Sequence, residues 1–176
     1  VAEQDVLMTL GVVPTRPDTN YAYVQACGGK KVYTCTEPMQ VKTYTEKPDK
    51  ELAKVFLSAG EFFWNAGIFI WKVSDIIAAF EKHLPDHAAL FNSVEELFGT
   101  SKEQEAIEKV FSGCRSISID YGIMEKADNV YVHSSDFGWS DVGTWGSAYQ
   151  NSRKDKYANA LSNDNIKVHN TRNSLI

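Results

Sequence analysis

The order of hydrophobic and polar positions along the chain predicts short strands separated by amphipathic helices. Runs in which apolar residues are continuous or alternate with polar ones, ended by proline, glycine or asparagine, are typical of strands. We expect strands at residues 6–13, 21–26, 31–34, 40–46 and 130–133, the second and third joined by a turn at residues 27–31. Two more apolar runs, residues 62–64 and 68–72, flank the polar break Asn65-Ala66-Gly67.

The helices are predicted from apolar positions three or four residues apart and from residues that begin or end a helix. Asp49 precedes such a pattern as an N-cap and Gly60 follows it, which predicts a helix between them. Ser74 or Asp75 is expected to cap a second helix that ends near His83. Further helical segments are expected at residues 86–98, 101–110, 121–127 and 145–150.

Strands that alternate with helices predict an α/β layered fold, in which ligands bind at loops that follow the strands. After residue 150 the sequence becomes polar, which predicts a linker at residues 151–161 and short β-like steps at 166–176. We therefore expect one domain at residues 1–155 and the start of a second, β-rich module at residues 156–176. Because the chain opens on a core strand and ends on an apolar run, we expect it to be part of a longer protein.

Charge and cysteine content argue against several classes of protein. Lysine and arginine number 18 against 23 aspartate and glutamate, a net charge of −5 without any basic run, so no nucleic-acid partner is expected. No signal peptide and no apolar run of membrane-spanning length is visible, so no membrane partner is expected. The three cysteines lack CxxC spacing, which argues against a disulfide framework or a zinc site and is consistent with a reducing cytoplasm.

One carboxylate, Asp141, lies between two glycines and two tryptophans in the stretch of residues 137–145. Its place after a predicted strand suits a hard cation beside a phosphate, because Mg²⁺ takes one or two protein carboxylates and fills its shell with water and phosphate oxygens. The alternative is a helix N-cap, in which Asp141 accepts from the backbone N–H of Gly143 or Thr144. The residues alone leave both interpretations open.

Three further loops carry polar side chains that suit a sugar phosphate. At a strand end, Glu46 can accept from vicinal hydroxyls and Lys47 can meet a phosphate as a point charge; the alternative is a solvated pair at a turn. Asn65 lies in an aromatic run, where its amide can bind a sugar hydroxyl or tie two loops together. Asp120 and Glu125 are acid/base candidates, although for Asp120 a capping or positioning role is favoured.

No pattern indicates a protein nucleophile or a glycine-rich phosphate loop. The sequence has no Ser-His-Asp order, histidine cluster or Cys-His pairing, and His133 is given no role. The motifs GxxxxGK[ST] and GxGxxG are absent. Nucleophilic catalysis by a side chain is therefore not expected.

Taken in order, these motifs closely resemble those of bacterial mannose-1-phosphate guanylyltransferases, a family of sugar-nucleotide pyrophosphorylases that make GDP-mannose. The resemblance covers nearly the whole chain, through residues 9–24 (TLGVVPTRPDTNYAYV), 46–48 (EKP), 64–69 (WNAGIF), 118–126 (SIDYGIMEK) and 138–145 (GWSDVGTW). It implies the later part of a Rossmann-like nucleotidyltransferase domain of the GT-A type, with a mixed sheet, followed by the start of a left-handed β-helix. The family's triphosphate loop, first metal-binding aspartate and guanine pocket belong to an N-terminal half that has no counterpart in this sequence.

The resemblance also implies roles for individual residues. Glu46 is similar to the carboxylate that holds mannose hydroxyls, Lys47 to the residue that faces the phosphate, and Asn65 to a sugar-hydroxyl partner. Asp141 is similar to a ligand of Mg²⁺, the expected cofactor, and together with Lys47 it would serve catalysis.

Tyr21 and Ala22 lie where the family makes a backbone contact to the sugar, although Asn20 and Ala22 replace two glycines of the family pattern. The implied reaction transfers GMP from GTP to mannose 1-phosphate, giving GDP-mannose and pyrophosphate, in a cytoplasmic homodimer. This piece by itself is expected to be inactive. The alternatives are a non-catalytic sugar-phosphate-binding or dimerisation module, and a pyrophosphorylase for another sugar 1-phosphate.

Overall fold

The computed structural model describes residues 5–26 and 37–176. The predicted turn at residues 27–31 and the predicted strand at residues 31–34 lie outside the described residues. Cys114, the cysteine that falls within the described ranges, forms no disulfide bond. Among the described residues, no helix combines the length and the apolar character needed to cross a membrane.

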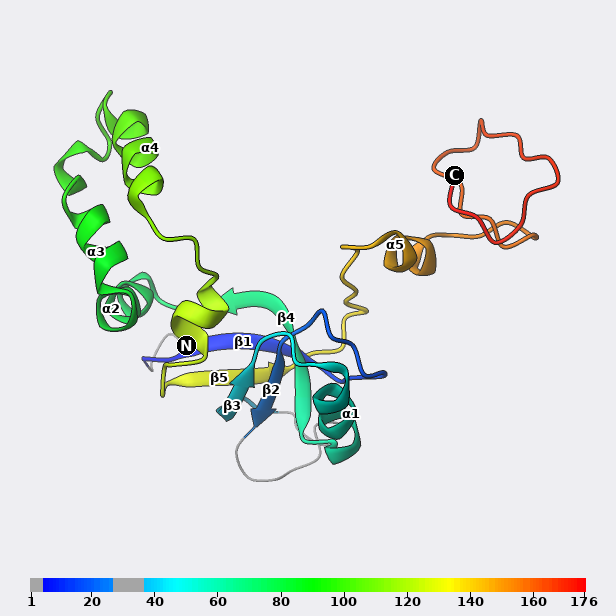
Figure 1. The fold of residues 1–176 in the computed structure, drawn as a ribbon, viewed down its shortest axis with the longest axis horizontal. Helices are drawn as coiled ribbons and strands as arrows, with labels where there is room; N and C mark the ends of the chain where they lie inside the picture. The colour runs from blue at the N-terminus through cyan, green and yellow to red at the C-terminus, as the bar shows by residue number, and fades with distance from the viewer. Residues whose placement is uncertain (1–4, 27–36) are drawn as a thin grey trace. The chain divides into compact units, whose positions relative to one another are not determined.

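Contacts divide the chain into two compact units, Val1–Asp136 and Phe137–Ile176. Among the described residues of the first unit, five strands close into a barrel with the order β1-β4-β2-β3-β5 (Figure 1). β1 and β5 run parallel and the other neighbours antiparallel, which confirms the predicted mixed sheet. The strands are β1 (Leu7–Val12), β2 (Tyr23–Ala26), β3 (Met39–Thr45), β4 (Phe62–Ile70) and β5 (Val130–Ser134).

The hydrophobic core of this unit is built from side chains of the strands and of the segment that contains Ile123 and Met124. The fully buried apolar side chains include Leu7, Val24, Phe63, Ile123 and Val132. Thr9, two positions after Leu7 on β1, is fully buried with them. Its hydroxyl must therefore find a partner inside the unit.

The two apolar runs around Asn65-Ala66-Gly67 form one strand, β4, with an irregularity at the polar break. Thr9 of β1 pairs with Phe69 and Gly11 pairs with Asn65, so β4 has extra residues between these two pairs. Gly67 has a φ of 69°, a left-handed conformation that glycine adopts without a steric penalty. A bulge of this kind redirects side chains, and here it falls beside Asn65.

α1 (Lys50–Ala59) confirms the first predicted helix and both of its boundary residues. The Asp49 side chain accepts from the backbone N–H of Leu52 at 2.8 Å, and Gly60 ends the helix with a φ of 67°. The Phe56 ring stacks on Phe62 of β4 with the ring centroids 4.0 Å apart. Figure 1 shows α1 lying beside β4, where this contact holds it.

α2 (Val73–His83) begins earlier than predicted, so the expected cap at Ser74 or Asp75 is wrong. Lys72 is the N-cap residue and makes no side-chain cap bond. The Asp75 carboxylate lies inside the first turn and accepts from the Ser74 hydroxyl at 3.1 Å. An acidic residue is favourable in this first turn because the exposed N–H groups there carry partial positive charge.

The predicted helical region at 86–98 is interrupted. It forms α3 (Pro85–Asn92) and the short 3₁₀ turn η2 (Glu95–Leu97), with Pro85 at the start of the helix, where its missing N–H costs nothing. The helix expected from residue 101 is α4 (Glu103–Gly113). α3 packs on α4, with Phe91 edge-to-face against Phe111.

The second unit contains α5 (Trp145–Asn151), which confirms the predicted helix there. Residues 152–176, all of them described, contain no regular strand. Two isolated bridges tie this segment together, antiparallel between Lys154 and Ala160 and parallel between Ala160 and Leu175. The fully buried Asn159 donates to the carbonyl of Thr171 at 3.0 Å and so anchors the segment internally.

Replacement of Gly11 by alanine tests the packing of the core. A Cβ at this position would lie 2.6 Å from Val132 Cγ2 and 2.8 Å from Phe63 Cβ, so both neighbours would have to move. We expect Gly11→Ala to lower the free energy of unfolding by about 1–3 kcal/mol in urea denaturation.

The matched control is Gly113→Ala, at the end of α4. Its Cβ would meet Leu90 Cδ1 at 3.9 Å, an ordinary contact. We expect a change within about 0.5 kcal/mol, or a small gain. Equal denaturation midpoints for the two variants would contradict the close packing at Gly11.

Candidate functional site

The end of β3 presents Glu46 and Lys47 as a pair. The Lys47 Nζ lies 2.9 Å from Glu46 Oε1, with the lysine side chain 59% exposed and the glutamate side chain 10% exposed. Their hydrogen bond and mutual attraction raise the pKa of Lys47 above its ordinary value. An ion pair with one exposed partner adds little to stability. It does leave the Lys47 ammonium accessible beside the Glu46 carboxylate, which is mostly shielded from water.

The backbone at this pair is also fixed. The N–H of Glu46 donates to Glu125 Oε1 at 3.0 Å, a contact between residues far apart in the sequence. Lys47 has a φ of 46°, which a residue with a side chain adopts only at a cost. Pro48, which follows, is buried. The strand end is therefore held in one particular conformation.

Asn65 lies at the centre of a buried polar network. Its Oδ1 accepts from the Thr9 hydroxyl at 2.5 Å and from the Gly67 N–H at 3.1 Å. Its Nδ2 donates to the Tyr44 hydroxyl at 2.5 Å and to Asp120 Oδ1 at 3.2 Å. Because the Gly67 N–H can only donate, the orientation of the amide follows from the network. Both donors and both acceptor positions of Asn65 are used within the chain. This fits the interpretation of Asn65 as an amide that ties two loops together.

Asp120 does not cap a helix, so the predicted capping role is wrong. The positioning role, which was predicted as its alternative, fits the structure. The residue opens the π-helical turn η3 (Asp120–Met124), and the N-cap position is Ile119. Its Oδ1 accepts from the Tyr44 hydroxyl at 2.5 Å. Burial, and then the hydrogen bond to Asp120, raise the pKa of Tyr44 far above its ordinary value, so the hydroxyl remains a donor.

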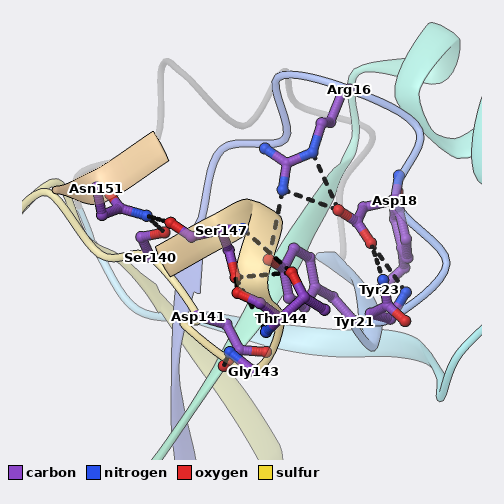
Figure 2. A network of polar contacts seen from close by, with 11 residues as sticks. Arg16, Asp18, Tyr21, Tyr23, Ser140, Asp141, Gly143, Thr144, Ser147 and Asn151 are labelled. Carbon is purple, nitrogen blue, oxygen red and sulfur yellow. Dashed lines mark hydrogen bonds and ion pairs between the residues drawn. The ribbon is translucent and has the colours of Figure 1, made fainter. Parts of the chain in front are cut away.

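Tyr21 and Ala22 lie at the end of a loop that precedes β2. The Ala22 carbonyl accepts from the Asn65 N–H at 2.9 Å, so the backbone there is joined to the bulge of β4. In Figure 2, Arg16 faces Asp18 and the Tyr21 hydroxyl, with contacts of 2.8 Å and 3.4 Å. This loop therefore has a defined shape beside the Asn65 network.

Asp141 belongs to the second unit and is exposed. Its Oδ1 accepts from the Gly143 N–H at 3.1 Å, the contact that was expected if Asp141 were a helix N-cap (Figure 2). The N-cap of α5 is nevertheless Thr144, which forms a capping box with Ser147, so the cap assignment for Asp141 is wrong. This local turn uses one oxygen of the carboxylate and leaves capacity for a further ligand.

The first unit thus brings Glu46, Lys47 and Asn65 into one connected group through Tyr44 and the turn η3. Tyr44 and Thr9 are not among the site residues predicted from the sequence. The signal for Thr9 was present, since it is a lone polar residue in an otherwise apolar predicted strand. The signal for Tyr44 was weaker, because a tyrosine suits any half-buried strand.

A metal ion would have few protein ligands here. Among the described residues, no group of three or more His, Cys, Asp or Glu side chains is arranged to hold a metal. A single carboxylate with a free oxygen, such as Asp141, still suits an ion that is bound mainly by phosphate oxygens and water.

Comparisons with known proteins identify the family of the chain. The profile of the family described as nucleotidyl transferase matches residues 1–157. The chain belongs to the nucleotidyl transferase family. A mannose-1-phosphate guanylyltransferase of Sinorhizobium fredii is 36% identical over 180 residues, covering 99% of this chain and 33% of the relative. A mannose-1-phosphate guanylyltransferase of Klebsiella pneumoniae is 34% identical, covering 99% of this chain and 37% of the relative.

Among solved structures, this nucleotidyl transferase chain superimposes on a crystal structure described as mannose-1-phosphate geranyltransferase from Thermus thermophilus. The TM-score is 0.73 at 31% identity, covering 93% of this chain and 45% of that one. The nucleotidyltransferase-like α/β fold expected from the sequence is confirmed. The chain spans about a third of the length of the curated relatives it matches.

Removal of the Tyr44 hydroxyl tests the buried network. Tyr44→Phe takes a donor from Asp120 and an acceptor from Asn65, leaving both only partly satisfied. We expect the free energy of unfolding to fall by about 1–3 kcal/mol. Tyr131→Phe on β5 is the matched control, since within the described residues its hydroxyl takes part in no hydrogen bond. A loss as large in the control would show that the network contributes nothing specific.

Proposed function

We propose that this chain forms the sugar-phosphate side of an enzyme that transfers GMP from GTP to mannose 1-phosphate, giving GDP-mannose and pyrophosphate. The observation that carries the proposal is the Glu46–Lys47 pair, a shielded carboxylate beside an exposed cation on a backbone held in place from a distant turn. A hexose phosphate presents hydroxyl donors next to an anionic group, the complement of such a pair. The relatives in Sinorhizobium fredii and Klebsiella pneumoniae, both mannose-1-phosphate guanylyltransferases, support the same substrate and favour it over a non-catalytic binding module.

In this proposal Glu46 accepts from mannose hydroxyls and Lys47 donates to the phosphate. The pair therefore holds the sugar phosphate in a fixed orientation and offsets its charge. Tyr21 and Ala22 would contact the sugar from their loop. Asn65 would reach a hydroxyl by giving up its longest bond, the 3.2 Å contact with Asp120, because its other contacts are shorter.

The proposed chemistry needs no protein nucleophile. A phosphate oxygen of mannose 1-phosphate attacks the α-phosphorus of GTP in line, and the bond to the bridging oxygen breaks as pyrophosphate leaves. Lys47, as one of the catalytic residues, keeps the attacking phosphate in place and reduces its repulsion from the triphosphate. Positioning of this kind is worth several kcal/mol in reactions between two bound substrates, on the order of 7–11 kcal/mol at best.

We propose Mg²⁺ as the divalent metal, with Asp141 as a ligand and second catalytic residue. The exposed carboxylate has one oxygen committed to the Gly143 N–H and another available, which fits an ion that keeps most of its shell for phosphate and water. When bound, such an ion supplies charge neutralisation to the phosphates. The turn at Gly143 orients the carboxylate for this contact.

Four further proposals follow from the resemblance. Residues 156–176 would begin a left-handed β-helix after a domain boundary at 155/156. The parallel bridge between Ala160 and Leu175 supports this, because such pairing joins successive coils of a β-helix.

The complete protein would be a homodimer and would act in the cytoplasm, where the free Cys114 suits a reducing compartment. The 176-residue chain by itself would make no GDP-mannose.

Binding of mannose 1-phosphate to the chain tests the sugar-phosphate site directly. We expect calorimetry to detect binding, and Lys47→Met to weaken it about ten-fold or more by removing a charged hydrogen bond to phosphate. Lys54→Met on α1 is the matched control, because Lys54 pairs with Glu51 of its own helix, and it should bind as the unaltered chain does. Equal affinity for the two variants would remove Lys47 from the site.

The metal assignment is tested by turnover in a protein of the relatives' full length that includes these residues. We expect Asp141→Asn to lower kcat about 100-fold or more, since a neutral amide is a poor ligand for Mg²⁺, with little change in melting temperature. Asp164→Asn, a second aspartate of the same unit, is the control and should retain activity. Wild-type turnover by the Asp141 variant would exclude it as a metal ligand.

A further inference from the structure

Two carboxylates at the turn η3 hold the end of β3. Asp120, the first residue of the turn, accepts from the Tyr44 hydroxyl, and Glu125, which follows the turn, accepts from the Glu46 N–H. The Glu125 N–H bonds to the Asp120 carbonyl at 2.9 Å, a bond five residues apart that widens the turn relative to an α-helix. The turn therefore carries one carboxylate at each end, and each meets a position at the end of β3.

The two contacts differ in what they hold. The hydrogen bond that Asp120 accepts fixes the side chain of Tyr44 within the buried network, so it serves the stability of the unit. The hydrogen bond that Glu125 accepts fixes the N–H of Glu46, directly before Lys47. The φ of Lys47, 46°, is unfavourable for a residue with a Cβ. Such a conformation persists only where the surroundings hold it. Pro48, which follows Lys47, has no N–H to donate. The hydrogen bond that the N–H of Glu46, the residue before Lys47, donates to Glu125 therefore supplies this hold.

We propose that Glu125 is a positioning residue for the Glu46–Lys47 pair. By accepting the Glu46 N–H, Glu125 keeps the strand end in the left-handed conformation in which Lys47 reaches the Glu46 carboxylate. Without this acceptor, the backbone of Lys47 relaxes toward negative φ values, and its side chain no longer points toward the Glu46 carboxylate. The inference rests on the proposed function, in which the pair binds a sugar phosphate.

The variants Glu125→Ala and Glu125→Gln separate this role from a simple effect of charge. Alanine removes the acceptor, whereas glutamine loses the charge but keeps a carbonyl oxygen at the same place. We expect calorimetry on the 176-residue chain to show about ten-fold weaker binding of mannose 1-phosphate for the alanine variant and no more than about two-fold for the glutamine variant. Both should melt close to the unaltered chain, because the contact is exposed.

Hydrogen exchange gives a second readout that does not depend on the ligand. The amide of Glu46 should exchange faster in Glu125→Ala than in the unaltered chain, while the amides within β3 keep their protection. Glu105→Ala on α4 is the control for loss of an exposed carboxylate, and it should change neither the exchange of Glu46 nor binding.

The outcomes distinguish this inference from the proposed function. If the unaltered chain binds mannose 1-phosphate and Glu125→Ala binds it equally well, the positioning role is overturned and the proposed function stands. If glutamine is as damaging as alanine, the side chain acts through its charge, which also overturns the inference. If the unaltered chain binds no sugar phosphate, the proposed function fails and the positioning role fails with it.

Discussion

The buried amide of Asn65 is the interaction on which the arrangement of the first unit depends. An amide in this position costs about 1–3 kcal/mol for each group left without a partner, so the surrounding chain has to supply two donors and two acceptors. It does so from β1 through Thr9, from the bulge of β4 through Gly67, from β3 through Tyr44 and from η3 through Asp120. Four segments that are distant in sequence are thereby placed at fixed distances, and the strand end with its ion pair is placed with them.

The parts of the fold that local chemistry decides were predictable from the sequence. The helix α1 has both its signals, Asp49 and Gly60, within its own residues, and the contact of Asp141 with Gly143 spans only two positions. The role of Asp120 was not predictable in this way. An aspartate before a short helix is usually a cap, but here its partner Tyr44 comes from a strand much earlier in the chain.

For the candidate site, residue types indicated which loops matter, whereas the structure shows how each is held. From residue types alone, Glu46 and Lys47 resemble any charged pair at a turn. The hydrogen bond from the Glu46 N–H to the Glu125 carboxylate shows that their backbone is fixed. Asn65 was open between two interpretations, and its full set of hydrogen bonds favours the structural one in this conformation. Long-range partners of this kind leave no periodic signal in a sequence.

The parallel pairing of β1 with β5 has a consequence for how the protein is made. Leu7 pairs with Val130 and Gly11 with Ser134, so the first strand of the barrel cannot complete its pairing before the last is present. Bringing such distant segments together costs loop-closure entropy before their contacts form, and proteins dominated by contacts of this kind fold slowly. During synthesis on the ribosome, β1 emerges long before its partner, and its open edge is exposed to pairing with other chains until the barrel closes.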